Sequence, residues 1–238
     1  MIKKTNELAI IMPVYNEEGI IQTVIADWTN ELQIIGIKNF KIHVYNDGSK
    51  DDTFKILKKI ALNNNNLVVH NKLNSGHGPT ILSGYQENID KDWIFQTDSD
   101  DEMSPKYFKY LWEKRESYDF LIGRRDNRSQ PTMRKIISFI SRLTVKVFYR
   151  KGIWDVNSPY RLMKTAKIKE IILNIPKDAF APNVIISGFV CLKKLKVCEI
   201  KIPHKNRQTG EVSIKKFKLF KAAFKSFSQT IRYRFVRN

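Results

Sequence analysis

The chain has 238 residues, 42% of them hydrophobic and 11% aromatic, which suits one large domain or a domain with an appendage. Its two cysteines, Cys191 and Cys198, supply neither a disulfide framework nor a zinc spacing, so a reducing cytoplasm is the expected compartment. The first residues lack the apolar core of a signal peptide, and no stretch of about 18 apolar residues is present to span a bilayer.

The formal net charge of +18 is concentrated near the C-terminus. Residues 191–238 contain 14 Lys and Arg residues against only Glu199 and Glu211. A segment this basic favours polyanions such as nucleic acid, anionic lipid or a phosphorylated substrate. The alternative interpretation is a solvated face that keeps the protein soluble.

Strand and helix patterns alternate along the first hundred residues. Apolar runs and helical periodicity predict strands over 8–14, 40–46, 67–70 and 92–97, and helices over 18–35, 49–62 and 78–89. This alternation with short loops is typical of an α/β fold, in which helices flank a mostly parallel, doubly wound sheet. Such sheets bind ligands at the carboxyl ends of their strands, where the strand order reverses.

Polar clusters follow three of these strands: PVYNEEG (13–19), NDGSKDD (46–52) and TDSDDE (97–102). A single acidic loop is usually a turn or a helix cap. Three such loops at one predicted edge of a sheet favour a functional site there. The glycine-containing NSGHGPTILSG (74–84) matches neither a P-loop nor a dinucleotide fingerprint, which argues against those two nucleotide-binding classes.

The third cluster places Asp98, Asp100, Asp101 and Glu102 within five positions. Carboxylates this close repel one another unless a cation joins them. Hard oxygen ligands favour Mg²⁺ or Mn²⁺, and Mg²⁺ commonly completes its shell with substrate phosphates. The pattern therefore predicts a divalent metal and a nucleotide diphosphate.

Four motifs, in order, resemble the GT-A fold family 2 glycosyltransferases: IIMPVYNEE, VYNDGSKDDT, NSGHGPTILSGY and IFQTDSDD. Three later segments are similar to polyprenyl-phosphate sugar synthases of the dolichyl-phosphate mannosyltransferase type: FLIGRRDNRSQPTMRKIIS, DVNSPYRLMK and CEIKIPHKNRQTGEVS. The resemblance covers roughly residues 8–215. The sequence departs from the pattern at Arg124, where Ser is usual, and at Pro159, where Gly is usual.

The resemblance implies a role for each matching residue. It implies nucleotide-sugar binding by Pro13, Tyr15, Glu17, Asp47 and Asp98. It implies metal binding by Asp98, Asp100 and Glu102, and phosphate binding by Arg125, Arg134 and Arg207. The catalytic set would be Asp98, Asp100 and Arg125. Asp155 and Arg161, in DVNSPYR, are expected either to position the acceptor or to pair with each other.

The implied reaction is the metal-dependent, inverting transfer of a hexose from a nucleotide-diphosphate sugar to a polyprenyl phosphate, dolichyl or undecaprenyl. A hydroxyl acceptor needs a general base, but residues 178–189 offer only Asp178, whereas a phosphate is already ionised near neutral pH. The missing base favours a phosphate acceptor. One alternative is transfer to a saccharide hydroxyl in cell-surface polysaccharide assembly. Another is nucleic-acid binding, prompted by a pI near 9.8, which leaves the strand-end carboxylates unexplained.

The last residues predict a basic amphipathic helix over 214–238, after a glycosyltransferase domain over 1–213. Its apolar residues recur every three or four positions, at Phe217, Phe220, Phe224, Phe227, Ile231 and Phe235. Phe opposite Lys and Arg is typical of a helix lying on an anionic membrane surface. The expected location is therefore peripheral, on the cytoplasmic face of the membrane. The alternative is a helix that packs its Phe stripe on the domain.

Overall fold

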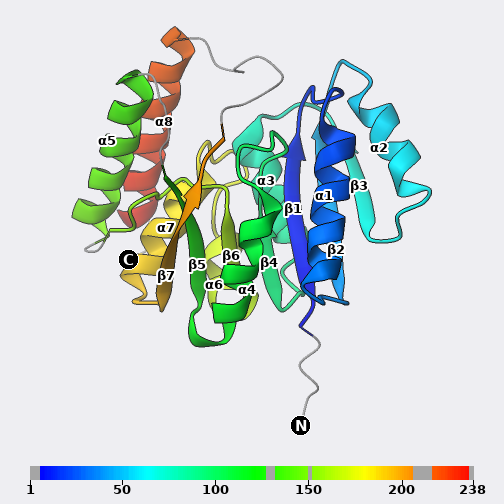
Figure 1. Ribbon diagram of the computed structural model, residues 1–238. Helices are drawn as coiled ribbons and strands as arrows, with labels where there is room; N and C mark the ends of the chain where they lie inside the picture. The colour runs from blue at the N-terminus through cyan, green and yellow to red at the C-terminus, as the bar shows by residue number, and fades with distance from the viewer. Residues whose placement is uncertain (1–5, 127–131, 150–151, 206–215, 236–238) are drawn as a thin grey trace.

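The computed structural model describes residues 6–126, 132–149, 152–205 and 216–235, with side chains described except at 132–136 and 216–223 (Figure 1). Seven strands form one sheet: β1 (Leu8–Val14), β2 (Phe40–Asp47), β3 (Leu67–Lys72), β4 (Trp93–Gln96), β5 (Phe120–Asp126), β6 (Arg161–Lys164) and β7 (Val197–Pro203). Their order across the sheet is β3-β2-β1-β4-β6-β5-β7. The four strands predicted from the sequence are confirmed, with ends shifted by at most two residues.

The sheet is mixed but mostly parallel. Strand β1 pairs in parallel with β2 and β4, β2 with β3, and β5 with β7, whereas β6 runs antiparallel to both β4 and β5. The start of β6 therefore lies at the same edge as the carboxyl ends of the other strands. Strands β2 and β3 are added on one side of β1, and β4 is then added on its other side. The strand order therefore reverses between β1 and β4.

Eight α-helices are described: α1 (Ile21–Ile34), α2 (Thr53–Ala61), α3 (His77–Glu87), α4 (Phe108–Lys114), α5 (Thr132–Phe148), α6 (Thr165–Leu173), α7 (Pro182–Leu192) and α8 (Lys216–Phe235). Helix α1 begins three residues later than the sequence predicts. The Glu18 carboxylate accepts a hydrogen bond from the backbone amide of Asp52 at 2.8 Å. Glu18 therefore belongs to the loop after β1, which contacts the loop after β2, and not to helix α1.

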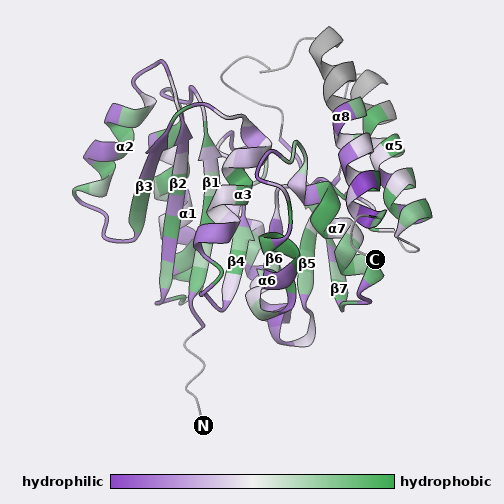
Figure 2. Cartoon of the chain, turned by 180° about the vertical axis from the view of Figure 1, so that it is seen from behind, coloured by the Kyte–Doolittle hydropathy of each residue, from purple (hydrophilic) through white to green (hydrophobic). Residues whose placement is uncertain are grey.

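Helices cover both faces of the sheet, and each face has its own apolar core. Alternate residues of β1 point to opposite sides: Ile10 packs in the core with Trp28 of α1, and Ile11 in the core with Tyr85 of α3. Because β1 is covered on both sides, it is a continuous apolar run, and it is coloured mainly hydrophobic in Figure 2. Gly84 lets α3 approach closely, since a Cβ there would lie 2.4 Å from Ile11.

Helix α8 lies beside α5, at the end of the sheet formed by β5 and β7 (Figure 1). The predicted boundary between a domain and a tail, at residue 213, falls outside the described residues. Among the helices in the described part of the chain, none combines the length and the apolar character needed to cross a membrane.

Candidate active site

Polar residues from five strands gather at the carboxyl edge of the sheet. Asp47 ends β2, Asp98 follows β4, Arg125 lies near the end of β5 and His204 follows β7. The register explains this arrangement, because Val14 pairs with Asn46 and the ends of β5 and β7 pair Asp126 with Pro203. Antiparallel β6 brings its preceding loop, residues 155–160, to the same edge.

Asp47 is buried, and its carboxylate organises the loop that leads into α3. It accepts hydrogen bonds from the amides of Ser75 at 2.8 Å and Gly76 at 2.9 Å, and it pairs with the Lys72 ammonium. Burial alone would raise the pKa of Asp47, but the Lys72 and Ser75 hydrogen bonds lower it below its usual value. Gly76 has φ +91°, a conformation that favours glycine. Asp47 is therefore a charged anchor beside the predicted nucleotide pocket.

The loops after β1 and β2 are joined to each other. The backbone amide of Lys50 donates a hydrogen bond to the side-chain oxygen of Asn16 at 2.8 Å. The backbone amide of Glu17 donates one to the hydroxyl of Thr53 at 2.8 Å. Of the residues predicted to line the nucleotide pocket from β1 and its loop, Pro13 and Glu17 are buried and Tyr15 is partly exposed. Tyr15 is the member of this set whose surface a ligand reaches most readily.

The acidic loop after β4 lines a small pocket whose walls are Thr97, Asp98, Asp100, Glu102, Met103, Arg125 and Pro159. Three of its four acidic residues thus line one space together with an arginine. The fourth, Asp101, has φ +53° and instead accepts a hydrogen bond from Lys205 at 3.0 Å. The left-handed turn at Asp101 divides the acidic run into pocket-lining and outward-facing residues.

Sequence reasoning missed the partners that hold this loop. Glu102 lies 2.8 Å from His204 Nε2, and its carbonyl accepts the Lys205 amide at 2.9 Å. The Asp98 carboxylate accepts a hydrogen bond from the side-chain nitrogen of Gln96 at 3.3 Å, and it lies 3.8 Å from His77 Nε2. The pairs between the loop and β7 join residues about a hundred positions apart, so no local pattern could have indicated them.

Arg125 is held by a two-pronged ion pair with Asp155. Its Nε and Nη2 donate to the two carboxylate oxygens at 2.7 and 2.8 Å. Burial would lower the pKa of Arg125, but Asp155, with further contributions from Asp98 and Glu102, raises it. The guanidinium is therefore a fixed positive charge beside the acidic pocket.

Asp155 forms its ion pair with Arg125, and its charge also acts on Arg161, whose pKa it raises. Arg161 is fully buried and donates to the carbonyls of Ser158 at 2.6 Å and Asn183 at 3.0 Å. Burial lowers its pKa to about 10. Arg161 thus ties the loop before β6 to the start of α7, and it has a structural role.

Two of the predicted phosphate-binding arginines cannot be placed. Arg134 lies in the first turn of α5, but its side chain is outside the described residues, and so is the whole of Arg207. Their roles stay predictions.

The pocket residues fit a divalent cation, Mg²⁺ or Mn²⁺, that shares its coordination shell with substrate phosphates. Within the described residues, no group of three His, Cys, Asp or Glu side chains is arranged to hold an ion. Mg²⁺ and Mn²⁺ need only one or two protein carboxylates when substrate phosphates complete the shell. Asp98 and Asp100 can supply these oxygens, and Glu102, bonded to His204, lines the same pocket.

Solved structures share this architecture. The chain is similar to glucosyl-3-phosphoglycerate synthase from Mycobacterium tuberculosis in complex with phosphoglyceric acid, with a TM-score of 0.69 and 14% identity, covering 96% of this chain and 80% of that one. The same synthase in complex with Mn²⁺, UDP and glucosyl-3-phosphoglycerate gives a TM-score of 0.67 at 12% identity, with the same coverage. S. aureus TarS in complex with UDP-GlcNAc gives 0.60 at 18% identity, covering 91% of this chain and 64% of that one. These similarities confirm the predicted GT-A-like α/β fold.

Curated relatives include the undecaprenyl-phosphate 4-deoxy-4-formamido-L-arabinose transferases. That of Pseudomonas paraeruginosa (strain DSM 24068 / PA7) is 24% identical over 220 residues, and that of Enterobacter sp. (strain 638) is 24% identical over 213. The alignments cover 91% and 88% of this chain, and 63% of each relative's length. The family model for glycosyl transferase family 2 matches residues 9–172, more than half of the sequence. Together with the fold and the acidic pocket at its carboxyl edge, this match shows that the chain belongs to glycosyltransferase family 2.

Proposed function

We propose that the protein transfers a hexose from a nucleotide-diphosphate sugar to a polyprenyl phosphate at a membrane surface, with Mg²⁺ or Mn²⁺ as cofactor. The observation that carries the proposal is the pocket in which Asp98, Asp100 and Glu102 face Arg125 at the carboxyl edge of the sheet. The donor class is supported by similar proteins whose structures hold UDP with Mn²⁺, or UDP-GlcNAc. The acceptor class is supported by relatives named for undecaprenyl phosphate.

The residues of the pocket suit a departing nucleotide diphosphate. Asp98 and Asp100 would hold the divalent ion, which when bound would stabilise the negative charge on the leaving phosphates. Arg125 provides a positive charge in the same pocket, and its ion pair with Asp155 fixes the guanidinium in place before the substrate binds. Asp47 and the Lys72 ammonium keep the neighbouring loop in one conformation.

The position of Asp178 favours a phosphate acceptor over a hydroxyl. Its side chain is exposed, lies 3.4 Å from Gln229 of α8, and is not among the residues that line the acidic pocket. A hydroxyl acceptor would need a carboxylate or imidazole poised to take its proton. An ionised phosphate attacks without such a base.

The test is a donor panel. The protein is incubated with UDP- and GDP-sugars, Mn²⁺ and undecaprenyl or dolichyl phosphate, and the product is sought as a glycolipid. Asp100→Asn is expected to abolish transfer. Asp101→Asn is the matched control, because the neighbouring carboxylate bonds Lys205 outside the pocket and its loss should leave most activity. The absence of product with every donor, or equal loss in both variants, would contradict the proposal.

A further inference from the structure

Trp154 is a half-exposed tryptophan that two arginines contact. It lies in the loop before β6 and is 54% exposed. The guanidinium carbon of Arg124, on β5, lies 4.1 Å from the centre of its ring, and that of Arg142, on α5, lies 4.3 Å from it. Each cation is attracted to the ring, but two like charges held over one ring repel each other. The arrangement therefore favours an anion that joins the two arginines.

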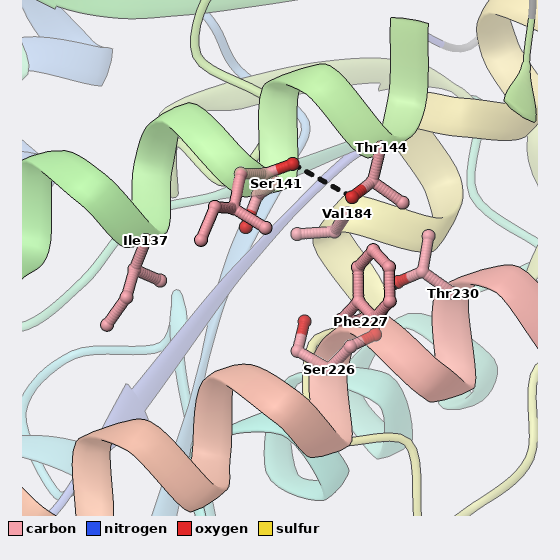
Figure 3. A pocket seen from close by; sticks show the side chains of 8 residues that line it. Ile137, Ser141, Thr144, Val184, Ser226, Phe227 and Thr230 are labelled. Carbon is pink, nitrogen blue, oxygen red and sulfur yellow. Dashed lines mark hydrogen bonds between the residues drawn. The ribbon is translucent and has the colours of Figure 1, made fainter. Parts of the chain in front are cut away.

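The elements that carry the two arginines are held in place by packing. Along β5, Ile122 packs in the apolar core on the α5 side of the sheet, and Arg124, two residues further, projects to the same side. On α5, Ser141 and Thr144 line a small pocket between α5, α7 and α8 (Figure 3). The inner side of α5 is thus fixed against its neighbours, and Arg142 extends from this helix to the ring.

The hydrogen-bonding edges of these guanidinium groups are available to a ligand. Stacking on a ring uses the flat face of a guanidinium and leaves the N–H groups at its edge to bond elsewhere. The buried Nε of Arg124 has no hydrogen-bond partner among the described residues. Within the same part of the chain, neither Arg124 nor Arg142 forms an ion pair with a carboxylate. The donors that an oxyanion needs are therefore present and oriented.

Another arginine stack in the chain provides a contrast. Arg115 lies 4.1 Å from the ring centre of Trp112, the same distance that separates Arg124 from the ring of Trp154. However, Arg115 Nη1 donates to the Trp112 carbonyl at 2.8 Å, and its Nε lies 3.6 Å from the Glu116 carboxylate. The protein itself supplies the partners of that arginine, whereas it leaves the charge at Trp154 unmatched.

The other charged residues on this side of the sheet leave it positive. Lys201 pairs with Arg124 in the register of β5 and β7, so both project to the same side. Glu199 lies on that side too, but its carboxylate accepts the Trp154 backbone amide at 2.9 Å and so holds the loop. Asp126, at the end of β5, is the other carboxylate expected there from the strand alternation. These two acids do not balance the two arginines and the lysine.

We propose that Arg124 and Arg142, held on Trp154, bind a phosphate group, either inorganic phosphate or a small soluble phosphomonoester. Two planar guanidinium forks suit a tetrahedral oxyanion because they donate to several of its oxygens. The site is separate from the acidic pocket, since Arg125 projects to the opposite side of β5 and lines that pocket. Binding requires neither a metal nor a sugar nucleotide. Serine, which is usual at position 124 in the enzymes that the sequence resembles, would supply no charge there.

The test follows the indole N–H resonance of Trp154 in the full chain, isotopically labelled at tryptophan nitrogen. The chain has four tryptophans, and Trp154→Phe identifies the signal that belongs to this one. Inorganic phosphate and glycerol phosphate should each move the signal saturably, whereas chloride at equal ionic strength should not. Arg124→Ser and Arg142→Gln should each weaken phosphate binding about tenfold or more, because each removes charge-assisted hydrogen bonds.

Arg115→Gln is the matched control, because it removes an arginine from a tryptophan stack whose partners the protein supplies. Phosphate binding at Trp154 should be unchanged in this variant. It should also persist in Asp100→Asn, even where glycosyl transfer is lost, so this proposal and the transferase proposal fail separately. A Trp154 signal that chloride moves as far as phosphate does, or equal phosphate affinity in Arg142→Gln and the wild type, overturns the site. Circular dichroism of each variant excludes unfolding as the cause.

Discussion

The Gln96 side chain lies 3.3 Å from Asp98 through its amide nitrogen, while its oxygen accepts hydrogen bonds from Asn183 at 2.7 Å and Tyr85 at 2.7 Å. A single buried amide thus joins a pocket carboxylate to the start of α7. Because the Gln96 oxygen is fixed by two donors, its nitrogen can point only toward Asp98, and this orients the carboxylate.

Gln96→Leu is therefore expected to lower both stability and turnover. The Asn183 side-chain amide would lose its buried acceptor, which costs about 1–3 kcal/mol of the free energy of unfolding, whereas the Tyr85 hydroxyl keeps an acceptor in the Asn183 oxygen at 2.9 Å. Turnover should fall further than substrate binding because Asp98 loses its orienting group. Urea denaturation and steady-state kinetics measure the two effects.

Tyr85→Phe is the control for that variant. It removes one donor to Gln96 but leaves the contact of Gln96 with Asp98, so stability should fall by about 0.5–1.5 kcal/mol while turnover changes little. Equal losses of turnover in the two variants would mean that the network supports the fold without orienting Asp98.

Breaking the pair between Arg125 and Asp155 should be costly. Both side chains are mostly buried, so Asp155→Ala leaves a buried charge unpaired and should lower the free energy of unfolding by about 3–5 kcal/mol. In a double-mutant cycle with Arg125→Ala, the double variant should be much more stable than the sum of the single losses implies. Simple additivity would show that the two residues do not interact in solution.

Lys72→Met should change the titration of Asp47. The folded pKa of Asp47 is lowered, so its contribution to stability is present above its usual pKa and is lost as pH falls through the folded value. Without the Lys72 ammonium, burial dominates and the pKa should rise, which moves the loss of stability to higher pH. Denaturation midpoints at several acidic pH values measure this shift. Lys38→Met, at an exposed lysine, should leave the profile unchanged.

A pair of histidines predicts a second pH effect. His43 Nδ1 lies 3.1 Å from His70 Nε2, and burial, followed by the charge of His70, lowers the pKa of His43 from 6.5 to about 4. Nearby Lys91 and Lys41 also lower it, and Asp90 opposes them. In this pH range His43 stays neutral in the folded protein but becomes protonated in the unfolded chain. Stability should therefore fall as pH drops from 6.5 toward 4. His43→Gln should flatten that part of the profile, and an unchanged slope would contradict the assignment.

Sequence patterns predicted the first half of the fold because its signals are local. The strand residues are continuous apolar runs, and the helices between them show helical periodicity, so β1 to β4 and α1 to α3 follow from neighbouring residues. The grouping of Asp47 and Asp98 at one edge also followed, since parallel strands end on the same side. Whether these two residues bind a nucleotide sugar stays a prediction.

The remainder depends on sheet order, which local patterns do not encode. The partner of Arg125 is Asp155 rather than a residue of its own segment, because antiparallel β6 carries the preceding loop back to the edge of the sheet. The outward direction of Phe224 could not be predicted either. Its periodicity fits a stripe that faces the domain equally well, and within that stripe Phe227 lines the pocket between the helices whereas Phe224 is 69% exposed.

Residues 101–102 and 204–205 form a clasp across the open edge of the sheet, through Lys205 with Asp101 and His204 with Glu102. The segment matched by the family model ends at residue 172, before the second half of this clasp. A fragment trimmed to that segment would keep the acidic loop but lose the strand that braces it. The smallest unit that keeps the brace on pocket residue Glu102 therefore extends at least through His204.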